Sequence, residues 1–174
     1  MTATSVRRLS PADLEDQVDE LAQLLIDVVN DGFPMGFLAP LAPATACAYW
    51  LSLRSELQSG ARLLLVARNR EGMVGTGQLA LSPWSNSPHR AELQKIMVNG
   101  AARGVGVGRA LIEALHDAAW QRGRSLLVLN TRHGERAQAL YRSLGYREAG
   151  VIPGWTIGSG GERYDHATLY LQLT

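Results

Sequence analysis

The sequence has a single cysteine, no long apolar run and almost no net charge, and each of these shortages excludes a class of protein. Cys47 has no second cysteine, so an internal disulfide and a cysteine-rich zinc site are both excluded. No stretch approaches the roughly 20 apolar residues of a membrane span, and no charged start followed by an apolar run marks a signal peptide. We therefore expect a cytoplasmic protein with no membrane partner.

The charged residues are nearly balanced in sign. Seventeen Lys and Arg residues face sixteen Asp and Glu residues, which leaves a formal net charge of +1 and no general field for nucleic acid. The four histidines have no metal-ligand spacing, so we expect no metal site. The 174 residues, 46% of them hydrophobic, are predicted to form a single domain over 1–174 with a substantial core.

Hydrophobic periodicity divides the chain into strands and helices. Ser10 as N-cap and Pro11 at the first position begin an amphipathic helix that is expected to reach about residue 30. A second helix is predicted over about 43–59, and an antiparallel hairpin turns at 70–72. Further strands are expected at 5–9, 90–98, 124–130, 146–150 and 163–173, and further helices at about 106–122 and 135–145.

The segment from 90 to 130 is a strand–helix–strand unit. Its two strands are therefore predicted to be parallel and joined by a right-handed crossover. The hairpin before it is antiparallel, so the fold class is α/β (α+β) with a mixed sheet.

Three glycines stand between the strand at 90–98 and the next helix. Glycine at this density costs backbone entropy, which indicates a place where bare backbone is needed. Free N–H groups and the positive end of the helix dipole form a site for a pyrophosphate there, although a tight turn without a ligand is the alternative. The spacing G-x-G-x-G fits neither the dinucleotide fingerprint nor the triphosphate loop, which needs a Gly–Lys pair. The stretch reads Arg103-Gly104-Val105-Gly106-Val107-Gly108-Arg109.

This R-x-x-G-x-G pattern after a strand resembles the pyrophosphate loop of the Gcn5-related N-acetyltransferase (GNAT) superfamily. A second stretch, "AQALYRSLGY", is similar to the A-x-x-L-Y-x-x-x-G-[FY] element of the same superfamily, with Ala137, Leu140, Tyr141, Gly145 and Tyr146 in register. "HRAELQKIMV" and the tail "GVIPGWTIGSGGERYDHATLYL" also resemble the bacterial tabtoxin-resistance type, so the resemblance covers most of the chain.

The resemblance implies a mixed central sheet of about six to seven strands, with a splayed parallel pair and about four flanking helices. It also implies acetyl-CoA as acetyl donor and an N-acetyltransferase acting on a small-molecule amine, such as a toxin or antibiotic. The expected cofactor-binding residues are Met97, Val98, Arg103, Gly104, Val105, Gly106, Val107, Gly108, Arg109 and Ala137. Backbone N–H groups of Met97 or Val98 would stabilise the oxyanion.

Two residues are candidates for the proton transfers. Glu92 is the expected base, because alternation places it with Gln94 and Ile96 on one face of its strand and superfamily members carry a base-type glutamate there. An ion pair with Arg90 or Lys95 is its structural alternative. Tyr141 is the expected acid toward the leaving thiolate, and a packed aromatic is the alternative.

Two positions depart from the family pattern. Asn130 stands where the tabtoxin-resistance type has an aspartate, so it can orient a water or the amine but cannot accept its proton. Gly134 stands where many members have an asparagine.

The acceptor pocket is expected between two irregular segments, "NDGFPMGF" and "PGWTIGSGGERYDH". Phe33, Trp155, Tyr164 and Asp165 are the candidate substrate-binding residues, with Asp165 attracting an ammonium group. The same apolar loops are also compatible with a homodimer. A protein N-terminal or lysine acetyltransferase is the rival enzyme, and an acyl-CoA-binding regulatory module is the rival without catalysis.

Overall fold

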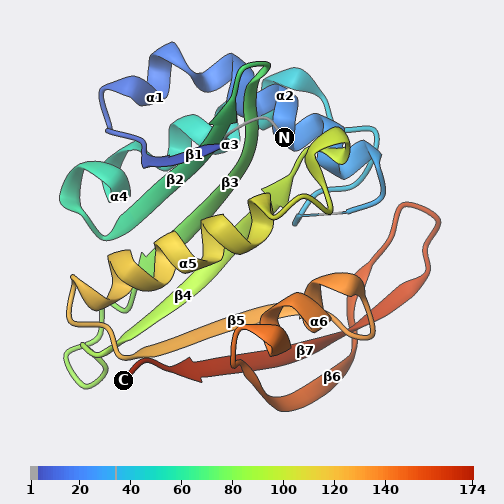
Figure 1. The fold of residues 1–174 in the computed structure, drawn as a ribbon. Coiled ribbons are helices and arrows are strands. Elements are labelled where there is room, and N and C mark those ends of the chain that lie inside the picture. Colours follow the sequence, from blue (N-terminus) through green and yellow to red (C-terminus); the bar gives the residue numbers. More distant parts are fainter. Residues whose placement is uncertain (1–3, 34) are drawn as a thin grey trace.

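Seven strands form one mixed sheet in the computed structural model, which describes residues 4–33 and 35–174. Their order is β1-β2-β3-β4-β5-β7-β6, and only β4 and β5 run parallel (Figure 1). The mixed sheet and its parallel pair are therefore confirmed. The strands are β1 (Ser5–Arg8), β2 (Arg62–Asn69), β3 (Gly72–Leu81), β4 (Arg90–Val98), β5 (Leu126–Arg132), β6 (Arg147–Ile157) and β7 (Arg163–Gln172).

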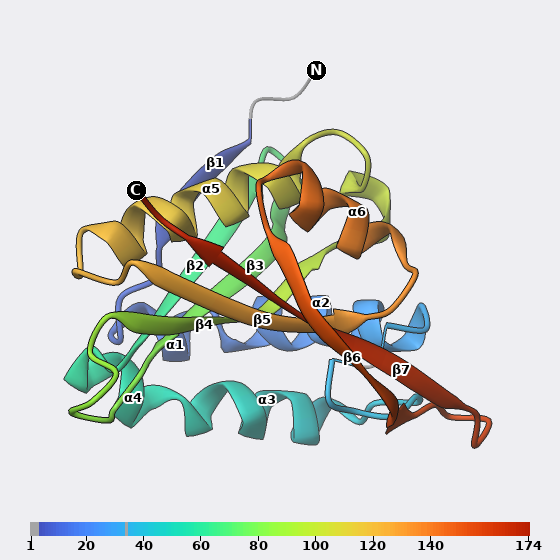
Figure 2. The ribbon, with the colours of Figure 1, turned by 90° about the horizontal axis from the view of Figure 1, so that it is seen from below.

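Helices cover the sheet unequally on its two faces. Helices α5 and α6 lie on one side, and α2, α3 and α4 lie on the other (Figure 2). Helix α5 packs on β2, β3 and β4, and α6 packs on β5, whereas α2 packs on β3 and β4 and α4 on β2. Within the described residues, no helix of the α2 side packs extensively on β5, β6 or β7. The helices are α1 (Asp13–Asp16), α2 (Val18–Asn30), α3 (Pro43–Ser52), α4 (Arg54–Ser59), α5 (Val107–Trp120) and α6 (Arg136–Ser143), with a 3₁₀ turn at Gly100–Ala102.

Each face of the sheet has its own apolar core. The stripe Leu21, Leu25 and Val28 of α2 packs with Trp50 of α3 on one face. Leu111 and its neighbours on α5 fill the other core. Burying each leucine stabilises the fold by roughly 1.5–3 kcal/mol. None of the described helices combines the length and the apolar character that crossing a bilayer requires.

The two N-terminal helices are interrupted, which the periodicity did not predict. The first helix begins at Asp13 with Ala12 at the N-cap position, so Ser10 and Pro11 do not start it as expected. The Ser10 hydroxyl still accepts the Asp13 N–H, and the Asp13 carboxylate accepts the Ser10 N–H, both at 3.2 Å. The helix stops at Gln17, whose side-chain oxygen accepts hydrogen bonds from two arginines, and α2 then begins. The helix expected over 43–59 also divides, because the Leu53 N–H bonds to the Trp50 carbonyl three residues back.

A β-bulge in β4 overturns the predicted alternation of its side chains. Lys95 has a φ of 51°, and the pairing of β3 with β4 shifts register between Thr76 and Gln78. Beyond the bulge the side chains change faces, so Ile96 packs into the α5 core while Met97 packs into the α2 core. Ile96 therefore does not share a face with Glu92 as predicted.

Candidate active site

A cavity of about 880 Å³ lies where the parallel strands separate. Strands β4 and β5 pair only through Arg90–Glu92 and Leu126–Val128. Past that point β4 continues to Met97 and Val98, which line the cavity together with residues of α5 and α6. The divergence leaves backbone groups at the β5-facing edge of β4 without a strand partner, so an extended ligand could pair there.

The glycine loop forms one end of this cavity, and its backbone is held open. Gly104 and Gly106 have φ values of 79° and 95°, and a Cβ added at either would contact nothing within 4 Å. These glycines therefore provide a left-handed backbone, not a packing contact. Within the described residues, the N–H groups of residues 104–109 donate to no protein acceptor. A run of free amides at a helix N-terminus is a site for an anion.

Gly108 has a different role from the other two glycines. Its φ is not positive, and an added Cβ would lie 3.4 Å from Leu140 Cδ2 and 3.8 Å from Val98 Cγ2. Gly108 thus lies where α5 passes close to α6 and β4. The two valines that alternate with the glycines also differ from each other. Val107, the first residue of α5, is buried, whereas Val105 is 63% exposed, and neither lines the cavity.

Three arginines line the cavity. The Arg103 guanidinium forms an ion pair with Asp31 at 3.2 Å, donates to the Val98 carbonyl at 3.0 Å and lies 4.5 Å from the centre of the Phe33 ring. Arg103 therefore connects the glycine loop to the loop after α2, and Asp31 partly offsets its charge.

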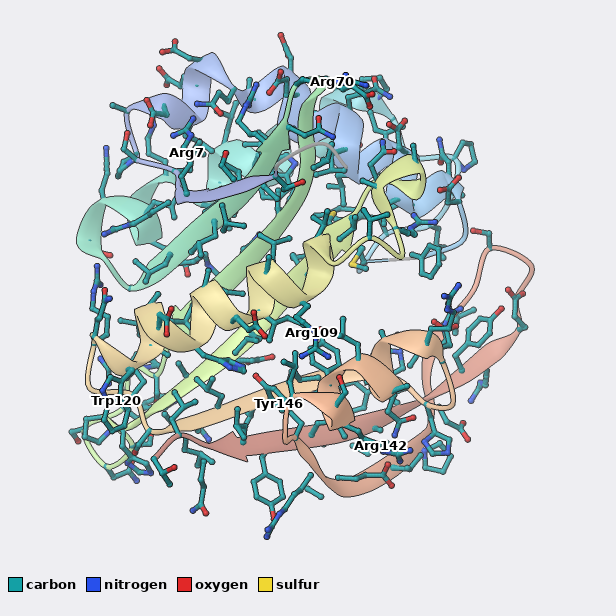
Figure 3. All side chains as sticks on the ribbon, viewed as in Figure 1. Arg7, Arg70, Arg109, Trp120, Arg142 and Tyr146 are labelled. Atoms are coloured by element: carbon teal, nitrogen blue, oxygen red, sulfur yellow. The ribbon has the colours of Figure 1, made fainter. Side chains whose placement is uncertain are left out.

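The other two arginines come from α5 and α6. Arg109 donates to the Ser143 hydroxyl at 2.8 Å and lies between these helices (Figure 3). Arg136 lines the cavity with Ala137, is exposed, and has no ion-pair partner within the described part of the chain. Sequence reasoning missed Arg136, although its place directly before Ala137 in the second motif could have indicated it.

Tyr141 reaches the cavity from α6. Its side chain is 7% exposed, and its ring packs edge-on against Tyr146 with a centroid distance of 5.4 Å. Burial raises the pKa of Tyr141 well above its ordinary value, so the phenol stays protonated. The Tyr146 hydroxyl is already engaged, since it lies 3.0 Å from His116 Nε2.

Glu92 and Asn130 share one face of the sheet but differ in their contacts. Glu92 is opposite Val128 of β5, and Asn130 is opposite Thr168 of β7, so all four side chains point to the α2 side. The Asn130 side-chain oxygen accepts a hydrogen bond from Thr168 at 2.8 Å. Glu92 forms no hydrogen bond or ion pair with any described residue, including Lys95. Neither side chain lines the cavity wall.

The predicted acceptor residues are only partly brought together. Phe33 lines the cavity under Arg103. Trp155 instead stacks on His166 with a centroid distance of 6.2 Å, and it lies in β6, which extends to Ile157. Thr156 and Ile157 of the expected irregular segment pair with β7, whereas Trp155 lies where the pairing shifts register.

Tyr164 and Asp165 make local contacts. The Tyr164 ring lies 3.6 Å from the guanidinium carbon of Arg132, and its hydroxyl donates to Glu162. The Asp165 carboxylate accepts the Gly154 N–H at 2.8 Å, so it stabilises the β6–β7 hairpin.

The two loops beside the acceptor side do meet. The Ala39 N–H, after α2, donates to the Ser159 hydroxyl in the β6–β7 turn at 3.0 Å. Met35 also lines the cavity; it lies in the segment "NDGFPMGF" that was expected there, although it was not among the candidate residues. No group of three or more His, Cys, Asp or Glu side chains within residues 4–33 and 35–174 is arranged to hold a metal ion.

The fold and cavity define an α/β protein with free amides at a helix N-terminus beside a splayed strand pair. The family model for the acetyltransferase (GNAT) domain matches residues 60–148, which include β4, the glycine loop, α5 and α6. The chain belongs to this family.

Known relatives agree with this assignment. The chain is 34% identical over 157 residues to an uncharacterised protein of Mycobacterium leprae; the match covers 90% of this chain but only 38% of that protein's length. It is 29% identical over 151 residues to the IAA acetyltransferase of Azospirillum brasilense; this match covers 86% of this chain and 88% of the relative. The structure of yncA from Salmonella typhimurium, solved with its cofactor acetyl-CoA, has the same fold, with a TM-score of 0.78, 20% identity and coverage of 99% and 95%.

Proposed function

We propose that this protein is an acetyl-CoA-dependent N-acetyltransferase that acts on a small-molecule amine. The observation that carries the proposal is the run of free amides at 104–109, which opens onto the cavity between the splayed strands. Glycine-rich loops at helix N-termini bind phosphate groups, including the diphosphate of nucleotide cofactors.

The residues present fit acetyl-CoA. The loop amides would hold the diphosphate, with Arg109 and Arg136 adding positive charge to the same cavity. The open edge of β4 near Met97 and Val98 would pair with the amide groups of the pantetheine arm, as an added strand does. A cavity of about 880 Å³ has the size expected of a site for a large organic ligand.

Glu92 supports the step that prepares the amine. An alkyl ammonium has a pKa of roughly 10.4, so it must lose a proton before it can attack. Glu92 has no hydrogen-bond or ion-pair partner among the described residues, and it faces the side of the sheet on which no described helix packs extensively beyond β4. It would accept the proton directly or through a water.

The remaining groups act on the thioester, which acetyl-CoA supplies together with its sulfur as leaving group. The N–H groups of Met97 or Val98 would stabilise negative charge on the carbonyl oxygen. Tyr141 would donate its proton to the departing sulfur. Burial raises the pKa of the Tyr141 phenol, and burial in the same cavity also raises that of a thiol, so the transfer remains feasible.

A small acceptor is supported by the contact between Ala39 and Ser159, which narrows the acceptor side. Asn130 would orient the amine or a water, since its oxygen is already held by Thr168. A role in resistance to a toxin or antibiotic is part of the same proposal. Protein N-termini and lysines are the rival acceptors, and an acyl-CoA-binding module is the rival without turnover.

The proposal is tested by two measurements on the purified chain. Calorimetry should detect binding of acetyl-CoA, and a thiol-release assay with a panel of small amines and short peptides should detect turnover. Absence of acetyl-CoA binding would refute the assignment. Binding without turnover of any acceptor would favour the regulatory module, and turnover of peptides alone would favour the protein acetyltransferase.

A further inference from the structure

Lys95, the only lysine in the chain, is placed by the β4 bulge on the acceptor side of the sheet. Its φ of 51° is uncommon for a residue with a Cβ and costs free energy. The bulge turns Lys95 toward the face that also holds Glu92 and Met97. Strained backbone of this kind is frequent at functional sites.

The Lys95 ammonium lies against the loop that follows α2. Its Nζ is 3.5 Å from the point that a Cβ on Gly36 would occupy, and Gly36 is exposed and directly follows Met35 in the cavity wall. Met97, two residues further along β4, also lines the cavity. Lys95 is therefore next to the acceptor end of the cavity.

This ammonium has no anionic partner. Within the described residues, it forms no ion pair and no hydrogen bond, and it lies 5.5 Å from the centre of the Tyr49 ring. A cation–π contact at that distance offsets only part of the cost of removing an ammonium from water. Burial lowers the pKa of Lys95, Arg62 lowers it further, and Glu92 acts in the opposite sense.

A neighbouring cation on the same face shows what a satisfied partner set looks like. Arg62 forms an ion pair with Glu56 at 2.9 Å and donates to the side-chain oxygens of Gln78 and Gln94 at 2.8 and 2.7 Å. Lys95 has nothing comparable. A partly buried cation without protein partners, beside a cavity, indicates a ligand that supplies the anion.

We propose that Lys95 binds an anionic group of the acceptor, so that the preferred substrates are amines that also carry a carboxylate. The inference rests on the proposed function. The diphosphate of acetyl-CoA would lie at the glycine loop, beyond Met97, and the pantetheine arm between the two is uncharged. The anion that Lys95 binds therefore belongs to the acceptor, whose ammonium would be attracted to Glu92 on the same face.

The test compares amino acids with their carboxamides as acceptors. The pairs differ only in the anionic group, and they should include both α- and ω-amino acids so that the spacing between the two charges varies. In the wild type, kcat/KM should be at least tenfold higher for the acid of the best pair. Lys95→Met keeps the apolar stem on Tyr49 and should abolish the preference, Lys95→Arg should retain part of it, and Arg8→Met, an equal charge change at the far sheet edge, should leave it unchanged.

A second measurement does not depend on turnover. Reductive methylation with ¹³C-labelled formaldehyde labels Lys95 and the terminal amine alone, and the Lys95→Arg variant assigns the signals. The acid of a pair should shift the Lys95 signal in CoA-saturated protein, and its carboxamide should not.

The outcomes separate the two proposals. Equal use of acid and carboxamide, or a preference that survives in Lys95→Met, would overturn the role of Lys95 while leaving acetyl transfer intact. Turnover of neutral amines alone, with no shift of the Lys95 signal, would do the same. Loss of acetyl-CoA binding in the wild type, measured by calorimetry, would instead refute the proposed function.

Discussion

Replacing Gly106 by alanine should weaken both the fold and the binding of acetyl-CoA, because the position needs a left-handed backbone. The φ of 95° is one that an alanine adopts only at a cost of about 1–2 kcal/mol. No atom lies within 4 Å of the added methyl group, so no steric clash contributes. The whole destabilisation should therefore come from the backbone.

Gly108→Ala is the matched control for this substitution. It adds the same methyl group two residues away, at a position without a positive φ, in ordinary contact with Leu140 and Val98. Alanine is a better helix former than glycine, by roughly 0.5–1 kcal/mol, so the stability of this variant should be unchanged or slightly raised.

Thermal denaturation measures the loss of stability, and titration calorimetry measures the loss of acetyl-CoA binding. For a chain of this size, a loss of about 1 kcal/mol should lower the Tm of Gly106→Ala by roughly 2–4 °C. Misdirecting one amide that donates to a charged diphosphate removes about 1.5–3 kcal/mol of binding, so the Kd for acetyl-CoA should rise at least about tenfold.

One pattern of results would refute this reasoning. If Gly106→Ala were as stable as Gly108→Ala and bound acetyl-CoA with the wild-type Kd, the left-handed turn would not be what orients the amides. The glycine loop would then be an ordinary turn, as the sequence alone left open.

Three further predictions concern Tyr141, Glu92 and His116. Tyr141→Phe keeps the packing on Tyr146 and should leave the acetyl-CoA Kd unchanged while kcat falls by roughly 10²-fold; an unchanged kcat would remove Tyr141 from the acid role. Glu92→Gln should lower kcat/KM at neutral pH by roughly 10²-fold, and the deficit should shrink as rising pH deprotonates the amine; a deficit constant with pH would contradict a base. Burial lowers the pKa of His116 in the folded state, so the unfolded state binds more protons at acidic pH and stability present above pH 6.5 is lost as the pH falls below it. Urea titrations at about pH 7.5 and 5.5 should therefore show a smaller loss for His116→Phe than for the wild type, and an equal loss would exclude His116 as a cause.

Features whose signal is local were predictable from the sequence. The glycine loop, the start of α5 and the second motif on α6 each depend on residues adjacent in the chain, so Gly104, Gly106 and Tyr141 could be singled out without a structure. The strand–helix–strand order also predicted the parallel pair, because a helical crossover of this length is the usual connection between two parallel neighbours.

Features that depend on long-range contacts were decided only by the tertiary structure. The bulge places Lys95 and Ile96 each on the face opposite to the one that alternation predicts. It arises in the pairing of β4 with β3, and alternation within one strand cannot reveal it. The partner of Arg103 is Asp31, 72 residues away, and β6 extends to Ile157 because β7 pairs with it. Hydrogen bonding and charge pairing are satisfied by whatever the fold brings near, so the sequence determined which groups could do the chemistry and the packing of distant segments determined what each group contacts.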